Sequence, residues 1–221
     1  MSKTKSNAEK KELELRKLRA ETVQAEAEAE QESLRLERQR RAHKEEFEYK
    51  PEARGVFHFT TDVNTASCAF FADQVSRYAH LNPGGDITIV IHSPGGSVLD
   101  GFGLYDTLRT LASQGHKITT VVRGYAASFG AVLLQAGDVR KVGPESHVML
   151  HEVSSMSWGK LHEVEDQVEF TKRLNARIFA LLAERTNGKW TGPKLYAKAK
   201  AKDWWVSGAE AVENGFADEV G

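Results

Sequence analysis

The 221-residue sequence contains a single cysteine, Cys68, which excludes a framework of internal disulfides. It has no long apolar run, and its polar N-terminus has no apolar signal core, so neither a membrane span nor a secretory leader is predicted. The 30 basic and 31 acidic side chains nearly balance, so the charge gives no general argument for binding nucleic acid. We therefore expect a cytoplasmic protein with neither a membrane nor a nucleic acid as partner.

Sequence patterns for bound metals and nucleotides are also missing. There are no paired cysteines. His147 and His151 lie four residues apart, but on an expected strand that spacing separates them by about 13 Å, too far for one ion. Gly95-Gly96 is not followed by a P-loop lysine, so hydrolysis of a nucleotide within this chain is not expected. The sequence thus predicts no metal and no cofactor.

Residues 1–50 lack glycine, proline and aspartate, and 25 of these 50 positions are Glu, Lys or Arg. This composition predicts a charged helical arm, with opposite charges four residues apart as in Glu12 and Arg16. The larger apolar residues follow no sustained heptad; they are Leu13, Leu15, Leu18, Val23, Leu34 and Leu36. Two interpretations stay open: a solvated helix, and a helix that pairs with a partner or a neighbouring subunit.

Pro51 ends the arm, and residues 51–221 form the second expected domain, in which strands alternate with helices. The expected strands are 56–59, 86–91, 118–123 and 147–151, and the expected helices are 65–80, 97–114, 128–135, 161–186, 193–200 and 207–214. This alternation is typical of parallel βαβ units in a layered α/β fold. In such sheets, reactive groups gather beyond the carboxyl ends of the strands.

One serine stands where an apolar strand meets a group of small residues. The β-branched run 118–122 breaks at Gly124 and leads into Ala126-Ala127-Ser128-Phe129-Gly130. A buried strand that turns sharply into a helix presents a hydroxyl at the corner, and small neighbours let a substrate approach. Ser128 is therefore a candidate nucleophile. Serine also caps helix N-termini well, and that structural role stays open.

A serine nucleophile needs a base, and the sequence offers eight histidines. His151 lies at the carboxyl end of the strand 147–151, where the rim of an active site is expected. His58 and His92 lie in or at the end of strands and are rivals to it. His147 shares a strand face with His151 but lies about 13 Å from it, so both cannot serve the same serine. His43 lies in the charged arm, and His80, His116 and His162 stand in polar surroundings suited to the surface.

Asp203 is the candidate acid that would hold the imidazole in one tautomer. It follows a lysine-rich stretch and precedes Trp204-Trp205, so a helix cap and an ion pair with Lys202 are the structural alternatives. We expect the nearby aromatic side chains to shield the carboxylate from water, which would strengthen its hold on an imidazolium.

Acyl transfer also needs two N–H donors for the oxyanion, worth about 3–4 kcal/mol each. The Phe129 N–H follows the serine at the start of a helix. The second donor would come from Gly96 in the turn Ser93-Pro94-Gly95-Gly96, which is otherwise an ordinary strand-to-helix turn. Taken together, these segments predict an acyl-transfer site.

The same segments resemble the Clp protease proteolytic subunit family, ClpP. The matching motifs are Ser93-Pro94-Gly95-Gly96, Gly124-Tyr125-Ala126-Ala127-Ser128-Phe129-Gly130-Ala131, Val148-Met149-Leu150-His151, Asp203-Trp204-Trp205-Val206-Ser207, Ala209-Glu210-Ala211-Val212 and Asn214-Gly215. The resemblance runs from about residue 55 to residue 221, and the order serine, histidine, aspartate is the family's order. It implies the layered βαβ fold shared by ClpP and crotonase, with a long handle helix at 161–186.

The resemblance implies a serine endopeptidase that cleaves polypeptides through an acyl-enzyme. By it, Ser128 is the nucleophile, His151 the general base and acid, and Asp203 the orienting carboxylate. The amides of Gly96 and Phe129 form the oxyanion hole. The family builds homo-oligomeric rings of seven that stack through the handle helix, enclose a chamber and dock a hexameric AAA+ unfoldase.

The sequence departs from this family pattern at three places. The charged arm replaces the segment that forms axial loops, Lys202 stands where arginine is common, and Val153–Trp158 replaces a glycine-rich stretch. These departures put ring stacking and an ATPase partner in question. The chain is also similar to the ClpP-type head maturation proteases of tailed phages, which cut scaffold and capsid proteins without an ATPase; in that case it would act in the host cytoplasm or a precursor capsid.

Three alternatives come from other classes. An enoyl-CoA hydratase-type (crotonase-type) enzyme would use a similar pair of N–H donors but would not need the serine, histidine and aspartate. A Ser-Lys peptidase of the signal-peptide-peptidase kind would need a lysine base and usually a membrane anchor. A non-catalytic ClpP-like ring subunit would keep the fold without the chemistry.

Overall fold

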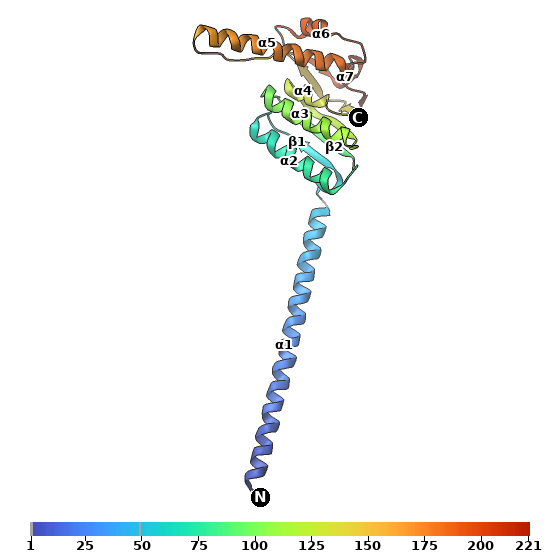
Figure 1. Ribbon diagram of the computed structural model, residues 1–221. Coiled ribbons are helices and arrows are strands. Elements are labelled where there is room, and N and C mark those ends of the chain that lie inside the picture. The colour runs from blue at the N-terminus through green and yellow to red at the C-terminus, as the bar shows by residue number, and fades with distance from the viewer. Residues whose placement is uncertain (1, 49) are drawn as a thin grey trace. The chain divides into compact units, whose positions relative to one another are not determined.

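The computed structural model describes residues 2–48 and 50–221 (Figure 1). The chain divides into two compact units, Met1–Lys50 and Pro51–Gly221. In the first unit, the helix α1 covers Ser2–Glu48. Every side chain from residue 12 to residue 42 is exposed, as expected for a helix with few apolar positions. The arm residues 1 and 49, and the side chains of 2–11 and 43–48 with His43 among them, lie outside the described part.

The second unit is built around a sheet of seven strands within the described residues. Five of them run parallel in the order β1-β2-β3-β4-β7: β1 (Val56–Phe59), β2 (Ile87–Ser93), β3 (Ile118–Ala127), β4 (Val139–Val142) and β7 (Glu219–Val220). The strand β5 (His147–Leu150) pairs parallel with the end of β3 and antiparallel with β6 (Trp204–Ser207).

The helices cover this sheet, and their bounds are η1 (Pro51–Arg54), α2 (Thr65–Leu81), α3 (Val98–Ser113), α4 (Phe129–Leu134), α5 (Leu161–Glu184), α6 (Gly192–Ala199) and α7 (Gly208–Glu213). Figure 1 shows α2 and α3 side by side next to β1 and β2, and α5 lying along α6. The α/β class and the ClpP-like layered fold predicted from the sequence are thus confirmed, including the long helix near residues 161–186.

The long strand β3 changes partner along its length, and this places its end near the site. Residues 119–122 of β3 pair with β4, whereas residues 125–127 pair with β5. The change occurs at Gly124, where φ is +86° and a Cβ would lie 2.4 Å from Nδ1 of His92. The sheet therefore splits beyond Gly124, and β5 brings its own carboxyl end beside that of β3.

Three strands were missed by the sequence analysis, and one corrects the expected topology. The strands β4, β6 and β7 have four, four and two residues, too few for a periodic apolar signal. The expected parallel units are present, and β6 adds an antiparallel pairing with β5 that the sequence did not predict. The N-terminal half of α5 is largely exposed, whereas its C-terminal half packs against the core through Ile178, Phe179 and Leu182.

Across the described ranges, none of the helices combines the length and apolar character needed to cross a bilayer.

Candidate active site

Ser128 occupies a sharp corner between β3 and α4. Its φ of 52° and ψ of −122° place a non-glycine residue at positive φ, which costs about 1 kcal/mol or more and persists only where the surroundings hold it. The Ser128 N–H donates to the carbonyl of Met149 at 2.9 Å, and this bond fixes the corner against β5. The predicted strand-turn-serine-helix arrangement is present, and the Ser128 hydroxyl makes no capping hydrogen bond to α4.

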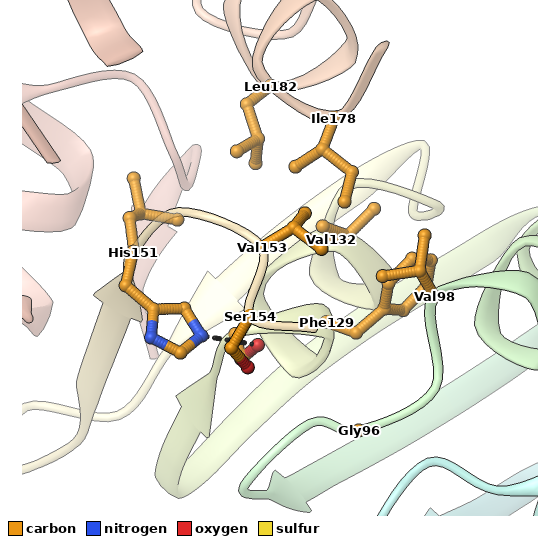
Figure 2. Close-up of a pocket in the computed structure, with 11 residues that line it drawn as sticks. Gly96, Val98, Phe129, Val132, His151, Val153, Ser154, Ile178 and Leu182 are labelled. Atoms are coloured by element: carbon orange, nitrogen blue, oxygen red, sulfur yellow. Dashed lines mark hydrogen bonds between the residues drawn. The ribbon is translucent and has the colours of Figure 1, made fainter. Parts of the chain in front are cut away.

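The His151 imidazole points at this hydroxyl. Its Nε2 lies 2.8 Å from Oγ of Ser128, the contact drawn as a dashed line in Figure 2. His151 follows the last residue of β5, so the pairing of β5 with the end of β3 sets the distance between the two side chains. The two residues are 23 positions apart in the sequence, and the structure brings them together.

Asp203 lies on the other side of the His151 ring from Ser128. One of its carboxylate oxygens, Oδ1, lies 3.3 Å from Nδ1 of His151. A proton on Nδ1 therefore faces the carboxylate, which leaves the lone pair of Nε2 to accept the proton of the Ser128 hydroxyl. The Asp203 side chain is 60% exposed, so the expectation that aromatic neighbours shield it from water was wrong. Trp204 and Trp205 are turned elsewhere, toward Trp190 and Tyr125.

The rival histidines have other surroundings. The His92 ring packs edge-on against Tyr125, and its Nδ1 lies 2.8 Å from the carbonyl of Arg123. His58 is an exposed residue of β1. His116, expected at the surface, is instead buried at 5% exposure, with Nδ1 2.9 Å from the carbonyl of Gly85. Of the histidines whose side chains are described, only His151 has a hydrogen-bond contact with the Ser128 hydroxyl.

The turn after β2 lies against the Ser128 corner. A Cβ built on Gly95 would lie 2.7 Å from the Phe129 nitrogen and 2.6 Å from the Ala127 carbonyl oxygen, so only glycine allows this approach. Within the described residues, neither Gly96 N–H nor Phe129 N–H donates to a protein group. Both predicted donors are thus unoccupied backbone amides next to Ser128.

A parallel backbone bridge between Val63 and Gly96 holds the turn after β2 in place. The Val63 N–H donates to the carbonyl of Gly95, and the Val63 carbonyl accepts from the N–H of Ser97, both at 2.8 Å. Gly96, with φ +145°, stands between these two bonds, where a Cβ would lie 2.2 Å from the Val63 oxygen. The sequence analysis missed Val63 because it lies in a short polar segment, Thr60–Asn64, with no motif.

A small pocket opens beside Ser128 and His151, with a cavity volume of about 50 Å³. Figure 2 shows Ile178 and Leu182 reaching into it from α5, opposite Val132 of α4 and Val153. Phe129, Val98 and Leu150 complete an apolar lining, and Ser154 adds a hydroxyl. Such a pocket suits an apolar side chain placed next to a reacting carbonyl.

Comparison with known proteins agrees with this geometry. A family model described as Clp protease matches residues 49–221. The chain belongs to the Clp protease family. It is 35% identical over 162 residues to an ATP-dependent Clp protease proteolytic subunit of Bacteroides thetaiotaomicron, covering 72% of this chain and 71% of the relative. Subunit 3 of the ATP-dependent Clp protease of Streptomyces coelicolor is 32% identical over 165 residues, 72% of each chain.

A Porphyromonas gingivalis protein, also named ATP-dependent Clp protease proteolytic subunit, is 33% identical over 162 residues, 72% of this chain and 70% of the relative. Membership of the Clp protease family implies a peptidase, and the sequence-based recognition of the family is confirmed.

In this family member, the segment after His151 is hydrogen-bonded to the helices α5 and α6. The Val153 N–H donates to Oδ1 of Asn175 in α5 at 3.0 Å, and the Tyr196 hydroxyl of α6 donates to Glu152 at 3.2 Å. Desolvation and the hydrogen bond to Glu152 raise the pKa of Tyr196. Among the described side chains, no group of three His, Cys, Asp or Glu residues is placed to hold a metal ion.

Proposed function

We propose that the chain is a serine endopeptidase that cleaves polypeptides through Ser128, His151 and Asp203. The observation that carries the proposal is the 2.8 Å contact between Ser128 Oγ and His151 Nε2, at a serine held in a strained backbone corner. A strained corner that exposes a hydroxyl to a base, beside two unoccupied amides, is an arrangement suited to acyl transfer.

In the first step, Nε2 of His151 takes the proton of Ser128 as Oγ attacks the carbonyl carbon of the substrate. The resulting oxyanion accepts hydrogen bonds from the amides of Gly96 and Phe129. His151 then gives its proton to the departing amine, and an acyl ester remains on Ser128. Water, deprotonated by His151, attacks this ester and releases the acid and the free serine.

Asp203 has an orienting role in this scheme. Its carboxylate, 3.3 Å from Nδ1, favours the tautomer with a proton on that nitrogen and stabilises the imidazolium that forms in each step. Because Asp203 is mostly exposed, water screens this attraction, so its contribution is smaller than that of a buried carboxylate.

The pocket beside Ser128 would accept the side chain that precedes the cleaved bond. Away from Ser128, His151 and Gly96, its lining is aliphatic apart from Phe129 and the hydroxyl of Ser154, and its cavity volume is about 50 Å³. A small aliphatic side chain such as valine fits these conditions better than an aromatic or charged one. Polypeptides with such residues are therefore the proposed substrate class.

We infer that several copies assemble into a ring, as the resemblance to ClpP implies. Large apolar side chains are exposed at the start of α5 and just before it: Met156 at 91%, Trp158 at 83% and Leu161 at 76%. Such a concentration is unfavourable in water and is typical of a surface that another subunit covers. We place this assembly in the cytoplasm, or in a precursor capsid if the protein belongs to a phage.

Two modes of substrate supply remain as alternatives. The relatives are named ATP-dependent, which favours an AAA+ unfoldase as partner. The exposed charged helix α1, which lies wholly outside the Clp family match, favours an ATPase-independent protease that recognises capsid or scaffold proteins. Degradation of an unfolded and a folded test protein, without ATP and unfoldase, separates the two: the first mode predicts that folded protein stays intact.

The family match and the histidine beside Ser128 favour a serine peptidase over a crotonase-type or Ser-Lys enzyme. The test is labelling of the full chain with a fluorophosphonate, together with turnover of a fluorogenic peptide ending in valine. Wild type and the matched control Ser155→Ala should label and turn over, whereas Ser128→Ala and His151→Ala should do neither. No labelling of wild type, with its native mass showing an assembled ring, would support the non-catalytic subunit instead.

A further inference from the structure

Ser93 carries a buried hydroxyl that the scheme above does not use. It is the last residue of β2, its exposed fraction is 0%, and it leads directly into the turn that presents Gly96. A buried hydroxyl needs hydrogen-bond partners, because leaving one unpaired costs about 1–3 kcal/mol. The partners it has therefore show what this side chain holds together.

The Ser93 hydroxyl bonds two backbone segments at once. Its Oγ donates to the carbonyl of Thr61 at 2.6 Å and accepts from the N–H of Gly95 at 3.2 Å. Thr61 lies two residues before Val63, whose N–H and carbonyl bond Gly95 and Ser97 on either side of Gly96. One side chain thus ties the turn to the same segment that supports it from behind.

Ser93 is also in contact with the nucleophile corner. It pairs in register with Ala126 of β3, and its carbonyl oxygen would lie 2.9 Å from a Cβ built on Gly130. Ser93 therefore stands between the two segments that carry the amides of Gly96 and Phe129. The Ser93 hydroxyl is therefore placed to influence the position of one amide relative to the other.

We propose that Ser93 is a positioning residue for the oxyanion hole. Its hydroxyl sets the direction of the Gly96 N–H by fixing Gly95 to Thr61, and it does not touch the substrate. The Ser93→Ala variant loses both hydrogen bonds without adding volume, whereas the two backbone bonds of Val63 to the turn remain. The effect appears in the transition state, where the oxyanion forms, and not in the binding of the ground-state peptide. This inference rests on the proposed serine peptidase function.

The test compares Ser93→Ala with Thr186→Val in the full chain. Thr186 is a suitable control, because its hydroxyl is also buried, donates to the carbonyl of Ala183 at 2.8 Å and accepts from the N–H of Trp190 at 3.2 Å, away from the oxyanion turn and the pocket lining. The Ser93→Cys variant keeps a weak donor and acceptor of similar size at the same place. Steady-state hydrolysis of the valine fluorogenic peptide and inhibition by the matching peptide aldehyde are measured for each.

Ser93→Ala should lower kcat by about 10- to 100-fold with KM little changed. A displacement of a catalytic group by about 1 Å lowers the rate by factors of this size. The inhibition constant of the aldehyde, whose adduct on Ser128 carries the oxyanion, should rise by a similar factor, while inhibition by the product acid stays the same. The kcat of Ser93→Cys should lie between those of wild type and Ser93→Ala. Thr186→Val should match wild type in kcat even where it unfolds at lower denaturant concentration.

The proposal is overturned if Ser93→Ala keeps its kcat within about twofold, if its loss lies in KM, or if Thr186→Val loses as much kcat. Failure of both Ser93 variants to fold would assign the hydroxyl to the stability of the fold and would also overturn it. An inactive wild-type protein would instead contradict the serine peptidase function itself, so the two failures are distinguishable.

Discussion

The backbone N–H of Ser128 donates to the carbonyl of Met149 at 2.9 Å. Met149 lies two residues before His151, so one backbone hydrogen bond joins the corner that bears the candidate nucleophile to the strand that leads to the candidate base. The distance between the two side chains thus depends on the pairing of β3 with β5, two rigid elements, rather than on a flexible loop. This supports the Ser128–His151 contact as a built-in feature of the sheet.

The first prediction concerns the approach of the turn to this corner. In Gly95→Ala, the new methyl would lie 2.7 Å from the Phe129 nitrogen and 2.6 Å from the Ala127 oxygen, both backbone atoms. The turn must move away, so peptide turnover should fall by about 100-fold or more. Gly84→Ala is the control, because Gly84 also has a positive φ but open space around it. Equal turnover in the two variants would contradict the role of close packing.

The second prediction concerns the orienting carboxylate. Asp203→Asn keeps the shape of the side chain and removes its charge, which allows the wrong imidazole tautomer, so kcat should fall by about 100-fold or more. Asp106→Asn, a similar change at an exposed position of α3, should leave kcat as in wild type. The measurement is kcat for the valine peptide, and an unchanged kcat in Asp203→Asn would remove Asp203 from the scheme.

The third prediction concerns the pocket. Ile178→Ala removes a side chain that lines it, so turnover should shift from peptides with valine toward peptides with leucine or phenylalanine before the cleaved bond. Leu181→Ala is the matched control, since Leu181 is buried on the same helix outside the pocket lining. Each change should destabilise the fold by about 2–5 kcal/mol. The preference should move in Ile178→Ala alone; an identical profile in both variants would contradict the assigned pocket.

The fourth prediction concerns stability in acid. Burial by itself would raise the pKa of Asp218, but hydrogen bonds and the charge of buried Arg140 outweigh it and hold this pKa below its ordinary value. A lowered folded-state pKa means that Asp218 stabilises the fold fully above about pH 5 and that this contribution is lost as the pH falls through the folded-state value. Denaturant midpoints measured from pH 7 to pH 3 should therefore decrease.

The variant Asp218→Asn should show a lower midpoint at pH 7 and a smaller decrease toward pH 3. Asp73→Asn, which removes an exposed ion pair with Arg77, serves as the control and should follow the wild-type profile. If the denaturant midpoint of Asp218→Asn decreased with falling pH as steeply as that of wild type, other carboxylates would account for the acid sensitivity.

The fifth prediction concerns assembly. Trp158→Ser removes the largest exposed apolar side chain before α5, so the native mass should fall from that of a ring to that of smaller species. Trp158→Phe keeps an aromatic side chain and should keep the ring. Native mass spectrometry of the full chain measures both, and an unchanged mass in Trp158→Ser would place the subunit contacts elsewhere.

Several features of the fold followed from the sequence because their signals are local. The β-branched run ending at Gly124 predicted β3 and its corner, and the apolar spacing of residues such as Ile178 predicted α5. In contrast, β6 forms because Trp204–Ser207 finds a partner in β5, more than 50 residues earlier, and no periodicity within four residues reveals that.

In the candidate site, too, some features followed from local sequence motifs and others depend on contacts between distant segments. Sequence motifs placed Ser128, His151, Asp203, Gly96 and Phe129 close to one another, and the structure brings all five to one corner of the sheet. The support from Val63 and the two bonds of Ser93 depend on contacts across about 30 residues, which no local pattern encodes. The exposure of Asp203 likewise depends on where the side chains of β6 turn.

The proposed acyl-transfer mechanism is tested most directly by a crystal structure of the full chain treated with a tripeptidyl chloromethyl ketone ending in valine. The serine oxygen adds to the ketone carbon of such a reagent, and the nitrogen of an adjacent imidazole bonds to its methylene carbon and displaces chloride ion. The mechanism predicts a single inhibitor molecule bonded both to Oγ of Ser128 and to Nε2 of His151, with the oxygen of its former ketone facing the amides of Gly96 and Phe129. An inhibitor bonded to another residue, or to neither of these two, would contradict it.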